Sequence, residues 1–358
     1  MTQRILIVGA GIIGASAAYH LQKSGAQVTV LDAGGPSATA ASFGWINASF
    51  YKDVHHFQLR AGSLSSYRAL CKTLDLPVHW CGALSWEVEG DALEAQRDEL
   101  EALGYDVREL DAEAFARLEP HVSTPPERCL QFQSEAAAES RLLAETLMEA
   151  AIAAGAQCLR GMRVTRLIEQ GGYVTGVQTE AGALHADHTL VAAGTASQEL
   201  LATINAVLPM VPRPALMVQT KPVPPVLSHI LVSELGELRQ LPNGALMIPA
   251  AVAHQADAAE HLPADINEAA SATVARLQNL MPNVPLSLGQ AMIGHRPMPE
   301  DGLPVMGRIA PGAYVAVMHS GITLGAIAGD LIAKDMLEGL AENEADLLTP
   351  YRPSRFIA

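Results

Sequence analysis

The sequence is poor in cysteine, in basic residues and in long apolar runs, and each shortage narrows the possible classes of protein. Its four cysteines, Cys71, Cys81, Cys129 and Cys158, form no C-x-x-C pair, which predicts free thiols in a reducing compartment. Only 23 Lys and Arg stand against 38 Asp and Glu, so the net charge of −15 disfavours nucleic acid and anionic membranes as partners. No apolar run reaches the roughly 18–20 residues that span a bilayer.

The length of 358 residues predicts about two domains or one large α/β body. Glycine and proline are spread without a period, which excludes collagen-like and low-complexity chains. The segment from Arg4 to Ala17 could pass for a signal peptide, but its glycines are spaced meaningfully and the chain after it completes a βαβ unit. We therefore expect a cytoplasmic protein, with peripheral attachment to a membrane partner left open.

One βαβ unit is predicted at the start of the chain. Residues 4–8 are continuously apolar, which is typical of a parallel strand covered on both faces. Residues 12–24 have the period of a helix, and residues 27–31 form the next strand, with Asp32 at its carboxyl end.

The turn between the first strand and the helix carries a dinucleotide-binding fingerprint. Gly9 makes the tight turn, Gly11 lets backbone approach a diphosphate, and Gly14 lets the helix pack on the strand. The helix amino end supplies free N–H groups and a positive dipole end for the diphosphate. Asp32 is placed to accept hydrogen bonds from ribose hydroxyls, and its charge disfavours NADP.

The rest of the chain predicts one nucleotide-binding body assembled from three stretches, 1–80, 138–212 and 289–358. A β-rich second domain, 81–137 and 213–288, is inserted between them. Glycine pairs and Pro-Asn-Gly turns indicate hairpins. The expected helices are 55–74, 91–119 (interrupted at Gly104), 138–154 and 265–281, and the expected strands include 163–169, 173–179, 189–193, 238–241, 245–249 and 313–318, before a final amphipathic helix.

The fingerprint alone does not separate NAD from FAD, but two later features favour FAD. Residues 189–197 return an apolar strand and a small-residue turn to the nucleotide region. A C-terminal helix begins at residues 320–323, directly after a short strand. Its amino end, aimed at a flavin pyrimidine, would stabilise negative charge on the reduced ring by roughly 0.3–1 kcal/mol, and up to ~2 kcal/mol when partly buried.

With these segments in view, the chain resembles the FAD-dependent oxidoreductases of the D-amino-acid oxidase, glycine oxidase and sarcosine oxidase family. The resemblance runs end to end and rests on the fingerprint, Ala40-Ala41-Ser42-Phe43-Gly44, Ala192-Ala193-Gly194, Gly294–Pro304 and His319-Ser320-Gly321-Ile322. It implies an α/β, glutathione-reductase-like fold: a Rossmann-like FAD domain with an inserted, mainly antiparallel β substrate domain. It also implies oxidation of a C–N bond in a small amine or amino acid, with hydride passing to flavin N5 and the imine then hydrolysed.

The resemblance also implies which residues contact FAD. They are Gly9, Gly11, Ile13, Gly14 and Asp32 at the diphosphate and ribose; Val164 at adenine; Ala193 and Gly194 in the small turn beside the cofactor; Ser42, Phe43 and Gly44 in the loop that passes the isoalloxazine; and Gly321, Ile322 and Thr323 at the helix start under the pyrimidine ring. Further expected FAD contacts are Ile12, Ala33, Ala41, Gly294, Arg296 and Ser320.

Arg296 and His319 are the predicted catalytic residues. Arg296 lies in a Gly-x-Arg-Pro segment whose arginine grips the substrate carboxylate in glycine oxidase-like members, a task that suits a planar guanidinium. The alternative is a structural pairing of Arg296 with Glu300 or Asp301. His319 stands where some relatives have a second carboxylate-binding arginine, and its alternative is a structural histidine.

Two departures from the family pattern bear on the chemistry. Sarcosine oxidase-like members hold a lysine over the flavin that assists the reaction with oxygen, but no lysine occurs between Lys221 and Lys334, and Met247 takes its expected place. A quinone or carrier is therefore slightly favoured over oxygen as acceptor. The last cysteine is Cys158, so the C-terminal thioether to flavin is unavailable and FAD is expected to bind non-covalently.

Two alternatives remain beside this interpretation. An NAD-dependent dehydrogenase would use the same fingerprint, and an electron-relaying or non-catalytic flavoprotein subunit would use the same fold. His185 and His188 superficially suggest a metal, but residues three apart on a strand point to opposite faces, so no metal site is expected.

Overall fold

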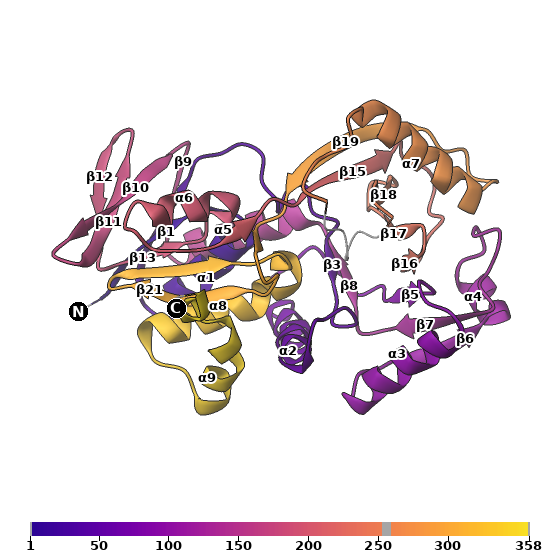
Figure 1. The fold of residues 1–358 in the computed structure, drawn as a ribbon, viewed down its shortest axis with the longest axis horizontal. Helices are drawn as coiled ribbons and strands as arrows, with labels where there is room; N and C mark the ends of the chain where they lie inside the picture. The colour runs from indigo at the N-terminus through magenta and orange to yellow at the C-terminus, as the bar shows by residue number, and fades with distance from the viewer. Residues whose placement is uncertain (1, 253–258, 357–358) are drawn as a thin grey trace.

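The computed structural model describes residues 2–252 and 259–356. Two lobes lie side by side, one built on a six-stranded sheet and the other on an eight-stranded sheet (Figure 1). The first and last described segments both belong to the first lobe. This is the α/β architecture that the sequence predicts, with a mainly antiparallel second sheet.

The first sheet joins strands from both ends and the middle of the chain. β1, β2, β9, β13 and β22 run parallel, and β21 pairs antiparallel with β22. In spatial order the strands are β21 (Val305–Ala310), β22 (Ala313–Val317), β13 (His188–Val191), β1 (Arg4–Val8), β2 (Gln27–Asp32) and β9 (Gln157–Arg160).

Strand β1 is covered on both faces, which explains its continuous apolar sequence. Ile5 and Ile7 pack into the cluster that contains the helices on one side. Leu6 and Val8 pack into a second cluster on the other side. Successive side chains of a strand point to opposite faces, so only an unbroken apolar run fills both.

Three helices pack on one face of this sheet. They are α1 (Ile12–Lys23), α5 (Ser140–Ala153) and α8 (Gly321–Leu337), and α1 contacts both of the others. Helix α8 is expected to be amphipathic but is buried around almost its whole first half, because α2 (Val54–Leu70) covers the side that solvent would otherwise reach. The short helix α9 (Glu342–Leu348) follows α8.

The opposite face carries a three-stranded antiparallel sheet and a short helix. Its strands are β10 (Val164–Gln170), β11 (Tyr173–Thr179) and β12 (Gly182–His185), and the helix is α6 (Ser197–Ala202). Leu167, Val177 and Leu201 fill the space between these elements and the first sheet.

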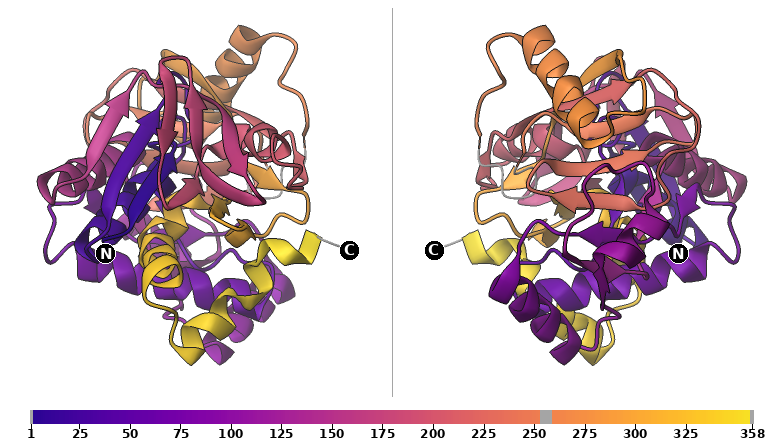
Figure 2. Two further views of the ribbon diagram at one scale, coloured as in Figure 1. Left: turned by 90° about the vertical axis from the view of Figure 1, so that its left-hand side faces the viewer. Right: turned by 90° about the vertical axis from the view of Figure 1, so that its right-hand side faces the viewer.

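The eight-stranded sheet forms the second lobe. Helix α7 (Ile266–Leu280) covers its outer face, as the view from that side shows (Figure 2). In spatial order its strands are β19 (Leu288–His295), β15 (Pro214–Thr220), β18 (Leu246–Pro249), β17 (Gly236–Gln240), β16 (Ile230–Ser233), β5 (Ala83–Ser85), β7 (Arg128–Phe132) and β6 (Arg108–Asp111).

Small elements join the lobes. The three-stranded sheet of β3 (Trp45–Ile46), β8 (Ala136–Ala138) and β4 (Val78–His79) stands between them, and β14 (Met210–Val211) pairs with β20 (Met298–Pro299). Met217 and Met247, on the inner face of the second sheet, share one apolar cluster with the first lobe.

Most predicted elements are confirmed, including the hairpins β10–β11 and β17–β18. The helical stretch 91–119 is wrong as one interrupted helix. It divides into α3 (Gly90–Ala102), strand β6 and α4 (Ala112–Leu118), because Gly104 ends α3 with a φ of +73° and Asp111 caps α4 through the Ala114 N–H at 2.8 Å. Strand β19 lies in the second sheet, so we propose the same two domains with their boundary moved from 288 to about His295.

All four cysteines are free, and burial raises the pKa of each thiol, which lowers the fraction of the nucleophilic thiolate form. Among the described residues, no helix is long and apolar enough to cross a membrane. His185 ends β12 and His188 begins β13, and the residues that the structure describes contain no cluster of three potential metal ligands.

Candidate active site

The fingerprint turn is shaped by close backbone contacts at two of its glycines. Gly9 has a φ of +107°, and a Cβ there would lie 2.4 Å from the Ala192 carbonyl oxygen. A Cβ on Gly14 would lie 1.9 Å from the Gly9 carbonyl oxygen. Gly14 lines neither cavity of the site, so its part is to let α1 approach the turn rather than to touch a ligand.

Thr39 is a residue at this turn that the sequence interpretation missed. Its hydroxyl accepts a hydrogen bond from the Ile12 N–H at 3.1 Å, at the amino end of α1. A Cβ on Gly11 would lie 3.2 Å from the same oxygen. Thr39 therefore supplies an oxygen at the place where the fingerprint predicts a diphosphate oxygen.

A long cleft of about 430 Å³ runs over the carboxyl ends of the first sheet's strands. Asp32 lies at the end of β2, and its Oδ1 accepts a hydrogen bond from the Gly34 N–H at 3.2 Å. The predicted residues that line this cleft are Gly9, Gly11, Ile12, Ile13, Asp32, Ala33, Ser42, Val164, Ala193, Gly194, His319, Gly321 and Ile322.

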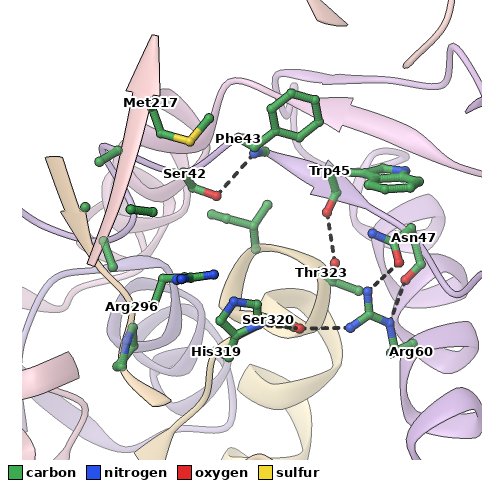
Figure 3. Close-up of a pocket in the computed structure, with 17 residues that line it drawn as sticks. Ser42, Phe43, Trp45, Asn47, Arg60, Met217, Arg296, His319, Ser320 and Thr323 are labelled. Carbon is green, nitrogen blue, oxygen red and sulfur yellow. Dashed lines mark hydrogen bonds between the residues drawn. The ribbon is translucent and has the colours of Figure 1, made fainter. Parts of the chain in front are cut away.

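A smaller cavity of about 90 Å³ adjoins the cleft, and the residues common to both are Ala38, Ser42, Pro297, His319 and Ile322. It lies between the loop after β2, the start of α8 and the inner face of the second sheet (Figure 3). The predicted residues that line it are Ala41, Ser42, Phe43, Gly44, Gly294, Arg296, His319, Ser320, Ile322 and Thr323.

The loop that carries Ser42, Phe43 and Gly44 is held in place by hydrogen bonds and by an arginine beside its phenyl ring. Gly44 has a φ of +81°, and its carbonyl oxygen accepts a hydrogen bond from the Ala138 N–H at 2.7 Å. The Ser42 hydroxyl accepts another from the Gly44 N–H at 3.2 Å, and the Arg239 guanidinium lies 5.7 Å from the Phe43 ring centre. The loop is thus held as a rigid wall.

Arg296 enters the cavity from the segment between β19 and β20 and is 8% exposed. Its Nε donates to the Arg213 carbonyl oxygen at 3.1 Å and its Nη2 to that of Pro214 at 3.4 Å. Asp301, one suggested structural partner of Arg296, is paired with Arg355 at 2.7 Å. Backbone carbonyls therefore orient the guanidinium, while Asp301 is engaged elsewhere.

His319 lies between the two cavities, directly before α8. Its Nδ1 is 3.4 Å from the Ser320 hydroxyl. At the first turn of the helix, the Thr323 hydroxyl donates to the Trp45 carbonyl oxygen at 2.9 Å. The amino end of α8 is thereby fixed against strand β3.

A buried carboxylate behind this wall was also missed by the sequence interpretation. Glu135 accepts hydrogen bonds from the Trp45 indole N–H at 2.8 Å, the Ala48 N–H at 3.2 Å, the Ser49 N–H at 3.1 Å and the Tyr105 hydroxyl at 2.8 Å. Burial raises its pKa above the usual range for a carboxyl. Glu135 thus ties the end of β3 to the second lobe.

The chain's own residues fit FAD. The turn leaves no room for side chains at Gly9 and Gly14, an acid ends the second strand, and the cleft continues to the amino end of α8. That helix end supplies unpaired N–H groups for an electron-rich ring. Among the described lining residues of both cavities there is no cysteine, which agrees with non-covalent binding.

Comparison with known proteins identifies one family whose model matches nearly the whole chain. A model of the family described as FAD dependent oxidoreductase (DAO) matches residues 4–334. The chain is 29% identical over 390 residues to the uncharacterized oxidoreductase YurR of Bacillus subtilis (strain 168), covering 99% of both chains.

Two solved structures share the whole fold. Glycine oxidase from Geobacillus kaustophilus superposes with a TM-score of 0.86 at 22% identity, covering 100% of both chains. L-proline dehydrogenase from P. horikoshii superposes with a TM-score of 0.85 at 18% identity, covering 99% of this chain and 98% of that one.

Proposed function

Because the chain belongs to the DAO family of FAD-dependent oxidoreductases, we propose that it oxidises the C–N bond of a small amine or amino acid carrying a carboxylate. Glycine oxidase and L-proline dehydrogenase, which share its fold, are named for substrates of this kind. The observation that carries the proposal is the buried guanidinium of Arg296 in a small cavity beside the FAD cleft.

The charge of the cavity supports an anionic substrate. Its titratable lining groups are Arg60, Arg296 and His319, and no Asp or Glu is among the described lining residues. A guanidinium binds both oxygens of a carboxylate at once, so Arg296 would fix the orientation of the substrate as well as its position. Ala215 and Met217 contribute apolar side chains to the wall on the side of the second sheet.

Orientation and desolvation are the contributions of the protein to the reaction. FAD, when bound, supplies the acceptor for a hydride from the C–H bond next to nitrogen. A substrate bound as the free amine needs no general base, so the cavity works by holding that bond in line for transfer. The resulting imine is then hydrolysed by water.

Substitution of Arg296 tests the assignment. In Arg296→Ala, the apparent affinity for the substrate should fall about ten- to a hundredfold, because a charge-assisted hydrogen-bonded pair is lost. Anaerobic mixing of the purified flavoprotein with D- and L-amino acids, N-methyl amino acids and cyclic imino acids, followed by flavin absorbance, finds the substrate and measures the change.

Arg213→Ala is the matched control, since the Arg213 side chain lies near Glu260 at 3.6 Å and does not line the cavity. An Arg296→Ala variant with unchanged affinity would remove the carboxylate assignment. Failure of the isolated wild-type chain to bleach with any of these compounds would favour an electron-relaying subunit instead.

We further propose a quinone or carrier, rather than oxygen, as the electron acceptor. No lysine is among the described residues that line the cavities, and Met247 on β18 is 2% exposed and packs beside Gln219. The enzyme reduced by substrate should therefore reoxidise faster with a quinone analogue than in air-saturated buffer. Equal or faster reoxidation in air would identify an oxidase.

The free thiols support a cytoplasmic location.

A further inference from the structure

Arg60 is a buried cation at the end of the small cavity opposite Arg296 (Figure 3). It lies on α2 and is 3% exposed. Its Nε donates to the Asn47 carbonyl oxygen at 3.1 Å, its Nη2 donates to Asn47 Oδ1, and its Nη1 donates to the Ser320 hydroxyl at 2.8 Å. One guanidinium thus joins α2, the segment after β3 and the residue that precedes α8.

The charge of Arg60 is permanent at neutral pH. Burial lowers its pKa to about 10, and attraction to Glu135 opposes that change. The three hydrogen-bond acceptors are all neutral oxygens. Glu135 itself is occupied by its four donors from Trp45, Ala48, Ser49 and Tyr105. In the part of the chain that the structure describes, no carboxylate accepts a hydrogen bond from Arg60, and the negative charge of Glu135 offsets the positive charge only in part.

The position of this charge coincides with the amino end of α8. Ser320 is the N-cap residue of that helix, and its side chain makes no hydrogen bond to the helix backbone. Its hydroxyl accepts from Arg60 at 2.8 Å, and His319 Nδ1 lies farther from it, at 3.4 Å. The helix dipole places partial positive charge at the same point. A full charge in a region of low dielectric adds to the dipole with little screening by solvent.

We propose that Arg60 is an electrostatic positioning residue of the coenzyme site, whose buried charge behind Asn47 and Ser320 favours the reduced, electron-rich form of FAD over the oxidised form. The inference rests on the placement of FAD at the start of α8 and is independent of the substrate. A residue that merely tied three segments together would alter stability or FAD affinity but not the balance between the two redox states.

The midpoint potential of the bound FAD tests this inference, measured by anaerobic titration against a reference dye. In Arg60→Gln, the equilibrium constant for two-electron reduction should fall at least tenfold, a shift of about 30 mV to more negative potential. Arg60→Lys keeps the charge and should retain most of the wild-type potential. The FAD dissociation constant, measured on the same variants, reports the structural contribution separately.

Arg68→Gln is the matched control. Arg68 lies on the same helix, but it donates to the Ser134 carbonyl oxygen at 3.1 Å and stacks on Trp80 at 3.9 Å, away from the cavity. The midpoint potential of FAD bound to Arg68→Gln should equal that of the wild type.

Asn47→Asp keeps the test decisive if Arg60→Gln does not fold. It leaves the arginine in place and sets a carboxylate against it, so the potential should again become more negative. Wild-type potentials in Arg60→Gln, or in Asn47→Asp where only that variant folds, would overturn the inference. The wild-type flavin would still be bleached by substrate in that case. The proposed function would therefore survive a failure of the inference about Arg60.

Discussion

Gly14→Ala is expected to lose FAD and to destabilise the apoprotein, whereas Gly11→Ala should lose FAD alone. The new Cβ at residue 14 would lie 1.9 Å from the Gly9 carbonyl oxygen, so α1 must move off the turn. Such overpacking costs about 1–3 kcal/mol or more, with or without coenzyme. Because the diphosphate site is built on that turn, we expect FAD affinity to fall at least a hundredfold, which is about 2.8 kcal/mol.

Gly11→Ala provides the comparison. Its Cβ would meet only the Thr39 hydroxyl, at 3.2 Å, and a side chain can turn away. The apoprotein should therefore unfold near the wild-type temperature, while the methyl group blocks the approach of a diphosphate. Thermal unfolding of the apoproteins and fluorescence titration with FAD measure both effects. Normal reconstitution of Gly14→Ala would show that the turn yields and that the glycine is not required.

Glu135→Ala is expected to lower the free energy of unfolding by about 3–5 kcal/mol. The substitution leaves the indole N–H of Trp45, two backbone N–H groups and the Tyr105 hydroxyl without their acceptor in a region closed to water. It also removes the buried negative charge that partly offsets Arg60. Denaturant unfolding of the apoprotein, followed by tryptophan fluorescence, measures the change.

Glu109→Ala is the control for a carboxylate of the same lobe that lies nearer the surface. Glu109 contacts Arg97 and Arg128 at 2.7 and 2.6 Å, and its side chain is 26% exposed. Solvent-accessible pairs contribute about 1 kcal/mol or less, so this variant should unfold close to the wild type. If the free energy of unfolding fell equally in the two variants, the burial of Glu135 would not increase its contribution to stability.

The sequence predicted the first lobe well because local patterns determine it. The apolar run in β1, the glycines of the turn and Asp32 at the end of β2 all lie within about thirty residues and each has a steric or electrostatic reason. The hairpins could be predicted equally well, since a glycine pair between two apolar strands strongly favours a tight turn.

Arg60, Glu135 and Thr39 could not be found in the same way. Arg60 lies on a helix rich in polar residues, and the sequence pattern does not distinguish it from an exposed arginine. Its environment is created by Ser320, which is 260 residues away in the chain. Glu135 is likewise defined by partners 30 to 90 residues away. Residues whose role depends on distant segments carry little local signal.

The helix expected over 91–119 was wrong for a related reason. Residues 108–111 have a polar, helix-compatible composition, yet they form β6 because β7 offers its free edge at that place. Arg128 and Arg97 then pair with Glu109 across the edge. Tertiary pairing overrides intrinsic propensity in such short segments.

The order of strands in the first sheet has a consequence for biosynthesis. β22 takes its place beside β13, which in turn pairs with β1, so a strand synthesised long after β1 completes the sheet that β1 begins. Helix α8, with residues 321–337, emerges from the ribosome later still. A nascent chain arrested before that point lacks one wall of the pocket, and we therefore expect only molecules that include α8 to mature into the yellow, protease-resistant form.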